Sequence, residues 1–168
     1  MSLQRILAVA LVPYVLWLVF AYQWHFLDGV NLLLHEGGHV CFFMFGQTLY
    51  MLGGTIGQLF FPAACAVHLW RQGRTFEGWV TGIWLAESLM SVARYMGDAQ
   101  AMALPLVGGD THDWNWLLAR WGLLTWCRAL SWLVHAGASA LALYCLWRAG
   151  GLAFGWDREA RELHDSAA

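Results

Sequence analysis

One motif in the sequence has residue types and a spacing that predict metal chemistry: His35-Glu36-Gly37-Gly38-His39. Residues four apart lie on one face of a helix, so His35 and His39 can direct both imidazoles at a single metal ion. In metalloproteases with this HExxH pattern the glutamate takes a proton from the attacking water, which is the role expected for Glu36. The alternative is a pair of packed core histidines beside a buried glutamate.

A catalytic zinc site needs a third protein ligand and keeps its fourth position open. Two histidines and a base are therefore an incomplete site. Folding could bring any of several acidic and histidine residues to the pair, and spacing along the chain does not choose among them. These candidates are Glu87, Asp98, His112, Asp113 and His135.

A glycine-rich stretch follows the motif and contains Gly53, Gly54, Gly57, Gln58 and Pro62. Such a stretch can open the backbone at membrane depth and line a cavity. In that case Gly53 and Gly54 would let an extended peptide approach, and Gln58 would donate to a substrate carbonyl. Close packing of helices, with Gln58 bonding between them, explains the same residues equally well.

The composition is that of an integral membrane protein. Of 168 residues, 60% are hydrophobic and only 12% are charged, and twelve are tryptophan. These fractions are far from those of a soluble domain. The net charge of -2 and the absence of lysine argue against a nucleic-acid partner. The expected partners are the lipid bilayer and a membrane protein or peptide substrate.

Apolar segments long enough to cross a bilayer as helices recur along the chain. They cover residues 6–24, 27–45, 49–70, 76–95 and 124–147. We therefore expect an all-α fold, a transmembrane helical bundle of about five spans. Residues 1–147 are expected to form one membrane domain, followed by a short polar C-terminal tail at 148–168. The short connector before residue 49 predicts that the next helix returns antiparallel beside the motif.

The arginines suggest an orientation. Arg71 and Arg74 lie two predicted spans before Arg148, Arg158 and Arg161, so all five are expected on one side of the membrane. The positive-inside rule makes that side cytoplasmic. The predicted location is a multi-pass integral protein of a bacterial-type inner (cytoplasmic) membrane, with its C-terminus in the cytoplasm.

The order of these features resembles the site-two protease family of intramembrane zinc metalloproteases, over about residues 27–99. Proteins of that family carry HExxH in a membrane helix, then a glycine-containing span, then a Leu-Asp-Gly motif whose aspartate is the third zinc ligand. The corresponding stretches here are residues 35–39, 53–62 and 97–99, where Gly-Asp-Ala stands in place of Leu-Asp-Gly.

The resemblance implies that His35, His39 and Asp98 bind Zn²⁺ and that Glu36 is the general base. His112 and Glu87 are kept as alternative third ligands. The predicted function is thus a zinc metalloprotease that hydrolyses peptide bonds within or next to the bilayer. A catalytically inactive metal- or tetrapyrrole-binding membrane scaffold or assembly protein is the alternative, because intramembrane histidines and many tryptophans would also serve it.

Overall fold

The computed structural model describes residues 2–107 and 111–156, and within these residues the chain is helical with no strand, which confirms the all-α class. Each expected apolar segment forms a helix. The elements are α1 (Leu3–Ala21), α2 (Phe26–Phe42), η1 (Phe43–Phe45), α3 (Gln47–Arg71), α4 (Thr75–Gly97), α5 (Asp113–Arg120), η2 (Leu124–Trp126) and α6 (Cys127–Phe154).

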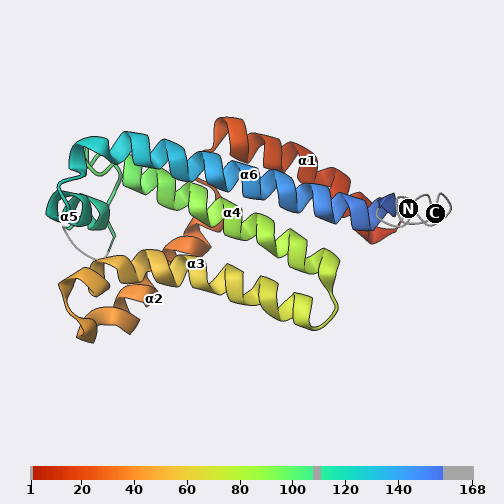
Figure 1. Ribbon diagram of the computed structural model, residues 1–168, viewed down its shortest axis with the longest axis horizontal. Coiled ribbons are helices and arrows are strands. Elements are labelled where there is room, and N and C mark those ends of the chain that lie inside the picture. The colour runs from red at the N-terminus through yellow and green to blue at the C-terminus, as the bar shows by residue number, and fades with distance from the viewer. Residues whose placement is uncertain (1, 108–110, 157–168) are drawn as a thin grey trace, which may run out of the picture.

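Helix α4 is the centre of the bundle, with α6 along one side and α3 along the other, while α1 lies against α6 (Figure 1). Small residues allow α4 and α6 to approach closely. A Cβ added to Gly82 would lie 2.7 Å from the Sγ of Cys145, and one added to Gly97 would lie 2.8 Å from the Oγ of Ser131. Close packing of this kind is the main source of association between helices in lipid.

Helix α2, which carries the motif, packs against α3. The chain reverses between them through η1 and Gly46, whose φ of +85° favours glycine. Glycines then bring the two backbones together. A Cβ on Gly53 would lie 2.9 Å from the carbonyl oxygen of Gly38, and one on Gly57 would lie 2.6 Å from that of Leu34. This part of the glycine-rich stretch therefore serves helix packing.

Within the described residues, three stretches are long and apolar enough to cross a membrane: α1, α3 and Leu124–Phe154, with mean hydropathies of 1.9, 1.3 and 1.5. Helix α2 has only 17 residues. Helix α4 carries Glu77, Glu87 and Arg94 along its length. The expected number of five spans is not confirmed.

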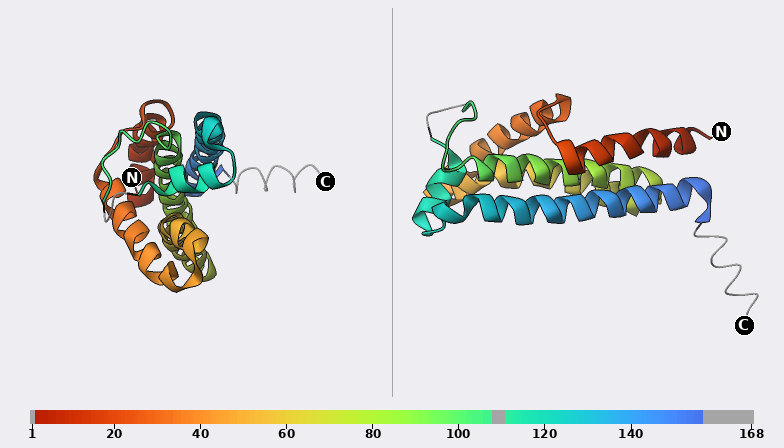
Figure 2. Two further views of the ribbon diagram at one scale, coloured as in Figure 1. Left: turned by 90° about the vertical axis from the view of Figure 1, so that its left-hand side faces the viewer. Right: turned by 90° about the horizontal axis from the view of Figure 1, so that it is seen from above.

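Successive spans of a membrane bundle normally alternate in direction, and α1 and α2 do not. Helix α2 continues along the bundle in the direction of α1 instead of folding back (Figures 1 and 2). Consequently the start of α1 and the end of α6 lie at the same end, where the Nε of Arg5 donates to the carbonyl oxygen of Ala153 at 3.1 Å. The α3–α4 turn lies at this end too, and α5 lies at the other.

The boundary expected at residue 147 falls inside a helix. Helix α6 continues through Arg148 to Phe154, so the first residues of the expected tail belong to the bundle. The rest of that tail, residues 157–168 with Arg158 and Arg161, lies outside the described residues.

Candidate metal centre

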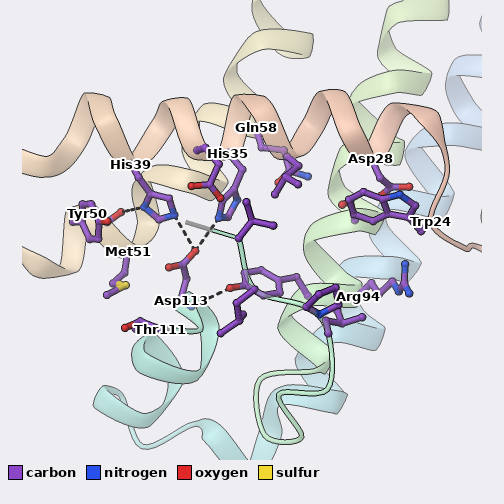
Figure 3. A pocket seen from close by; sticks show the side chains of 18 of the residues that line it. Trp24, Asp28, His35, His39, Tyr50, Met51, Gln58, Arg94, Thr111 and Asp113 are labelled. Atoms are coloured by element: carbon purple, nitrogen blue, oxygen red, sulfur yellow. Dashed lines mark hydrogen bonds and ion pairs between the residues drawn. The ribbon is translucent and has the colours of Figure 1, made fainter. Parts of the chain in front are cut away.

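His35 and His39 converge on one carboxylate oxygen of Asp113 (Figure 3). The Nε2 atom of His35 lies 2.8 Å from Oδ2 of Asp113, and the Nε2 atom of His39 lies 3.1 Å from it. All three ligand atoms lie within 4.8 Å of one another, a spread that one metal ion can bridge. The side chains are only 9%, 12% and 7% exposed, so the group is shielded from bulk solvent.

Several helices position these side chains. The two histidines lie one turn apart on α2, and Asp113 is the first residue of α5. The backbone N–H of Asp113 donates to the hydroxyl of Tyr95 on α4, at 3.2 Å. Asp113 is thereby fixed by both its own helix start and the central helix of the bundle.

Helix α3 shapes the other side of the centre. Gly54 leaves room for the ring of His35, since a Cβ there would lie 2.4 Å from Nε2. The backbone oxygen of Tyr50 accepts a hydrogen bond from Nδ1 of His39 at 2.7 Å. Helix α3 therefore makes room for the ring of His35 and fixes that of His39.

The bond to Tyr50 also bears on what the centre could hold. A carbonyl oxygen can only accept, so Nδ1 of His39 carries a proton, and in a neutral ring Nε2 then presents a lone pair. That lone pair faces an acceptor oxygen of Asp113, an arrangement that is stable only with a proton or a cation between them. Two imidazole nitrogens and a carboxylate oxygen suit zinc, and zinc-binding histidines characteristically donate from their other nitrogen. The residues fit zinc.

Electrostatics support an ionised Asp113. Burial by itself raises the pKa of the Asp113 carboxyl, but the hydrogen bonds with His35 and His39 outweigh it, so the pKa lies below its ordinary value. A ligand carboxylate must be ionised, so this environment favours binding. Burial lowers the pKa of the adjacent His112 despite the opposing effects of Asp98 and Asp113, which leaves that ring neutral at pH 7.

A cavity of about 580 Å³ opens onto the centre, and Glu36 lines it together with the three converging residues. Within the part of the chain that the structure describes, the Glu36 carboxylate forms no hydrogen bond or ion pair, so it is available to a bound molecule. The apolar part of the cavity wall includes Trp24, Leu32 and residues 104–107. A mostly apolar cavity with a few convergent polar groups is typical of a ligand site.

Asp98, the third ligand implied by the resemblance, does not join the histidines. It follows the last residue of α4, and its carboxylate accepts the backbone N–H groups of Ala103 and Leu104 at 3.1 and 2.9 Å. Its Oδ2 also lies 3.7 Å from Nε2 of His112. Asp98 therefore shapes the loop that lines the cavity, and the carboxylate brought to the histidines is that of Asp113.

The other candidate histidines have structural partners. His112 caps α5, where its Nδ1 accepts the backbone N–H of Asn115 at 3.3 Å. His135 Nε2 donates to the carbonyl oxygen of Val19 at 3.0 Å and so joins α6 to α1. Neither belongs to the group that converges on Asp113.

The three residues expected to position a substrate have different surroundings in the structure. Gly53 packs against the backbone of α2, and Gly54 makes room for His35. Gln58 lines the cavity, and its amide donates to the carbonyl oxygen of Ser88 at 3.1 Å, which joins α3 to α4. The packing interpretation thus accounts for Gly53, and Gln58 combines an interhelical bond with a place in the cavity wall.

Glu87 belongs to a second polar group, with His25 and Asp28, at the junction of α1, α2 and α4. Nδ1 of His25 lies 2.7 Å from Oδ2 of Asp28, and the hydroxyl of Tyr22 contacts both carboxylates. Asn31 donates to Glu87 at 2.8 Å. Because each carboxylate has donors from within the chain, this junction holds the start of α2 against its neighbours.

Sequence reasoning did not single out Tyr50 or Tyr95. Tyr50 acts through its backbone oxygen, which no side-chain pattern reveals, and Tyr95 has no fixed spacing from the motif. Asp113 did have a sequence signal, because a capping histidine followed by an aspartate marks the first turn of a helix and so places a carboxylate at a rigid helix start. Comparison with protein-family models, curated proteins and solved structures gave no match for this chain.

Proposed function

We propose that the protein is a membrane-embedded zinc metalloprotease that hydrolyses peptide bonds within or next to the bilayer. The observation that carries the proposal is the convergence of His35, His39 and Asp113 at a cavity that Glu36 also lines. Compared with the ligand set implied by the family resemblance, Asp113 takes the place of Asp98.

The roles of the residues follow from their chemistry. Zinc held by two imidazoles and a carboxylate supplies Lewis-acid activation of a carbonyl oxygen and of water. Glu36 takes a proton from the water that attacks the scissile carbonyl carbon and later gives it to the leaving nitrogen. The apolar cavity wall limits competing water and so strengthens these electrostatic interactions.

The proposed setting is a multi-pass protein of a bacterial-type inner membrane, with a membrane protein or peptide as substrate. Four of the seven arginines in the described residues lie toward the end of the bundle where α1 begins and α6 ends, namely Arg5, Arg71, Arg74 and Arg148, against Arg94, Arg120 and Arg128 toward the other end. The positive-inside rule assigns that end to the cytoplasm. The metal centre, at the start of α5, is then nearer the opposite face.

Metal analysis of detergent-purified protein tests the site. We expect about one zinc per chain in the wild type and its loss in Asp113→Ala, because two imidazoles alone hold zinc weakly. Asp98→Ala is the matched control, since it removes a nearby carboxylate outside the centre and should keep the metal. Zinc lost from Asp98→Ala but kept by Asp113→Ala would contradict the proposed ligand set.

Glu36→Gln tests the chemistry separately from metal binding. The variant should keep its zinc and lose cleavage of quenched fluorescent peptides with apolar sequences, assayed in detergent micelles, because glutamine cannot accept the proton. A zinc-loaded wild type that cleaves the peptides no faster than Glu36→Gln would favour the catalytically inactive scaffold instead.

A further inference from the structure

We infer that the hydroxyl of Tyr95 is a catalytic hydrogen-bond donor, which stabilises the negative oxygen formed on the scissile carbonyl. The inference rests on the proposed function and extends it to a residue of α4. Tyr95 lines the same cavity as Glu36 and the three converging residues.

The ring of Tyr95 contacts two histidines. It stacks on His112, with ring centroids 4.0 Å apart and planes inclined by 19°. It also meets His35 edge-on, with centroids 5.8 Å apart and planes inclined by 80°. A donor fixed in advance in this way does not have to reorganise when charge develops, which is the basis of electrostatic catalysis.

The hydroxyl has a proton to give. A phenol has one proton and two lone pairs, and the oxygen of Tyr95 uses a lone pair to accept the backbone N–H of Asp113. Within the described residues no group accepts the Tyr95 proton. Accepting one hydrogen bond also strengthens the bond that a hydroxyl donates. The arrangement therefore leaves a polarised donor next to the metal centre.

The proposed reaction needs such a donor at one stage. As the water oxygen bonds to the carbonyl carbon, the π electron pair moves to the carbonyl oxygen and a water proton passes to Glu36. The electron pair then returns, the C–N bond breaks, and the leaving nitrogen takes the proton from Glu36. Tyr95 keeps its proton and donates a hydrogen bond while the oxygen is negative, so it favours the transition state over the ground state.

Tyr95→Phe tests this role, because the phenyl ring keeps the stacking on His112 and loses only the hydroxyl. Removing one such donor costs about 100-fold or more in kcat. We expect that loss in zinc-loaded protein, with zinc content and KM little changed. Tyr144→Phe is the matched control, since Tyr144 lies on α6, does not line the cavity, and its hydroxyl accepts a hydrogen bond from Arg148.

Inhibitor binding separates catalysis from a role in merely holding Asp113. A peptide phosphonate, built on the fluorescent peptide that the wild type cleaves fastest, carries a tetrahedral anionic group like the reacting carbonyl. An N-methyl amide of the same peptide mimics the uncleaved substrate. Tyr95→Phe should weaken phosphonate binding about 100-fold and leave amide binding unchanged.

Equal weakening of both peptides, or loss of zinc from Tyr95→Phe, would overturn the inference and make Tyr95 a positioning residue for Asp113. So would unchanged kcat in that variant. These outcomes differ from failure of the proposed function, in which the wild type holds no zinc or Glu36→Gln cleaves as fast as the wild type.

Discussion

Gly54 of α3 lies directly against the imidazole of His35 on α2. A Cβ on Gly54 would stand 2.4 Å from Nε2 and 2.5 Å from Cε1 of that ring, closer than nonbonded atoms approach. The ring can point at Asp113 only because position 54 has no side chain. The sequence placed Gly54 among candidate substrate contacts, whereas in the fold it makes room for the ring of His35.

Gly54→Ala should therefore weaken zinc binding. The added methyl forces the ring of His35 away from Asp113, and disturbing the orientation of a ligand typically costs about 10- to 100-fold in affinity. Competition with a fluorescent zinc chelator measures the change. Gly29→Ala on α2 is the control, because its Cβ would meet nothing within 4 Å. Wild-type zinc affinity in Gly54→Ala would show that the ring is not held as described.

The two glycines inside the motif should respond oppositely to substitution. A Cβ on Gly38 would lie 2.0 Å from the carbonyl oxygen of Gly53, so Gly38→Ala must push α2 and α3 apart. Overpacking of this kind costs about 1–3 kcal/mol in the free energy of unfolding. A Cβ on Gly37 meets nothing within 4 Å, so Gly37→Ala should gain up to about 1 kcal/mol from helix propensity.

Unfolding of both variants in mixed micelles of a mild detergent and SDS gives these free energies. The pair controls for itself, because the substitutions are identical and adjacent. Equal stability of Gly37→Ala and Gly38→Ala would contradict the close α2–α3 contact.

Local sequence patterns predicted the helices well and their contacts poorly. Apolar runs predicted the five long helices of the described residues, because hydrophobic length is a local property. The proposed third ligand was different. Asp98 and Asp113 are both aspartates near a helix end, and only tertiary packing decides that one accepts loop N–H groups while the other faces His35.

Local sequence patterns could not predict the direction of α2 relative to α1 either. The polar break after Tyr22 does not indicate whether the next helix folds back or continues in the same direction. In the structure the junction of His25, Asp28 and Glu87 ties the start of α2 to α4, and α2 runs on in the direction of α1. Long-range polar contacts of this kind leave little trace in a single sequence.

Asn31 should be essential to that junction. Its Nδ2 donates to Glu87 at 2.8 Å, and its Oδ1 accepts from Nε1 of Trp84 and Oγ of Ser88, each at 3.0 Å. Asn31→Leu leaves a buried carboxylate short of a donor and two donors without an acceptor. Because each buried unsatisfied group costs about 1–3 kcal/mol, we expect a loss of about 3 kcal/mol or more.

SDS-induced unfolding measures the loss, with Ser88→Ala as the control. That variant removes only one of the donors to Asn31 and leaves its other bonds in place, so it should cost about 1 kcal/mol. A loss in Asn31→Leu no larger than that in Ser88→Ala would argue that the junction does not hold α2 in place.

The common end of α1 and α6 predicts that both chain termini lie on one side of the membrane. Five antiparallel spans would separate them, whereas the observed order brings Arg5 to the carbonyl oxygen of Ala153. Green fluorescent protein fused to either terminus should fluoresce in bacteria, because it folds in the cytoplasm, where the clustered arginines place this end. Alkaline phosphatase fused after Gly122, at the opposite end, should be active in the periplasm. Reporters that place the two termini on opposite sides would favour an odd number of spans and contradict the arrangement of α1 and α2.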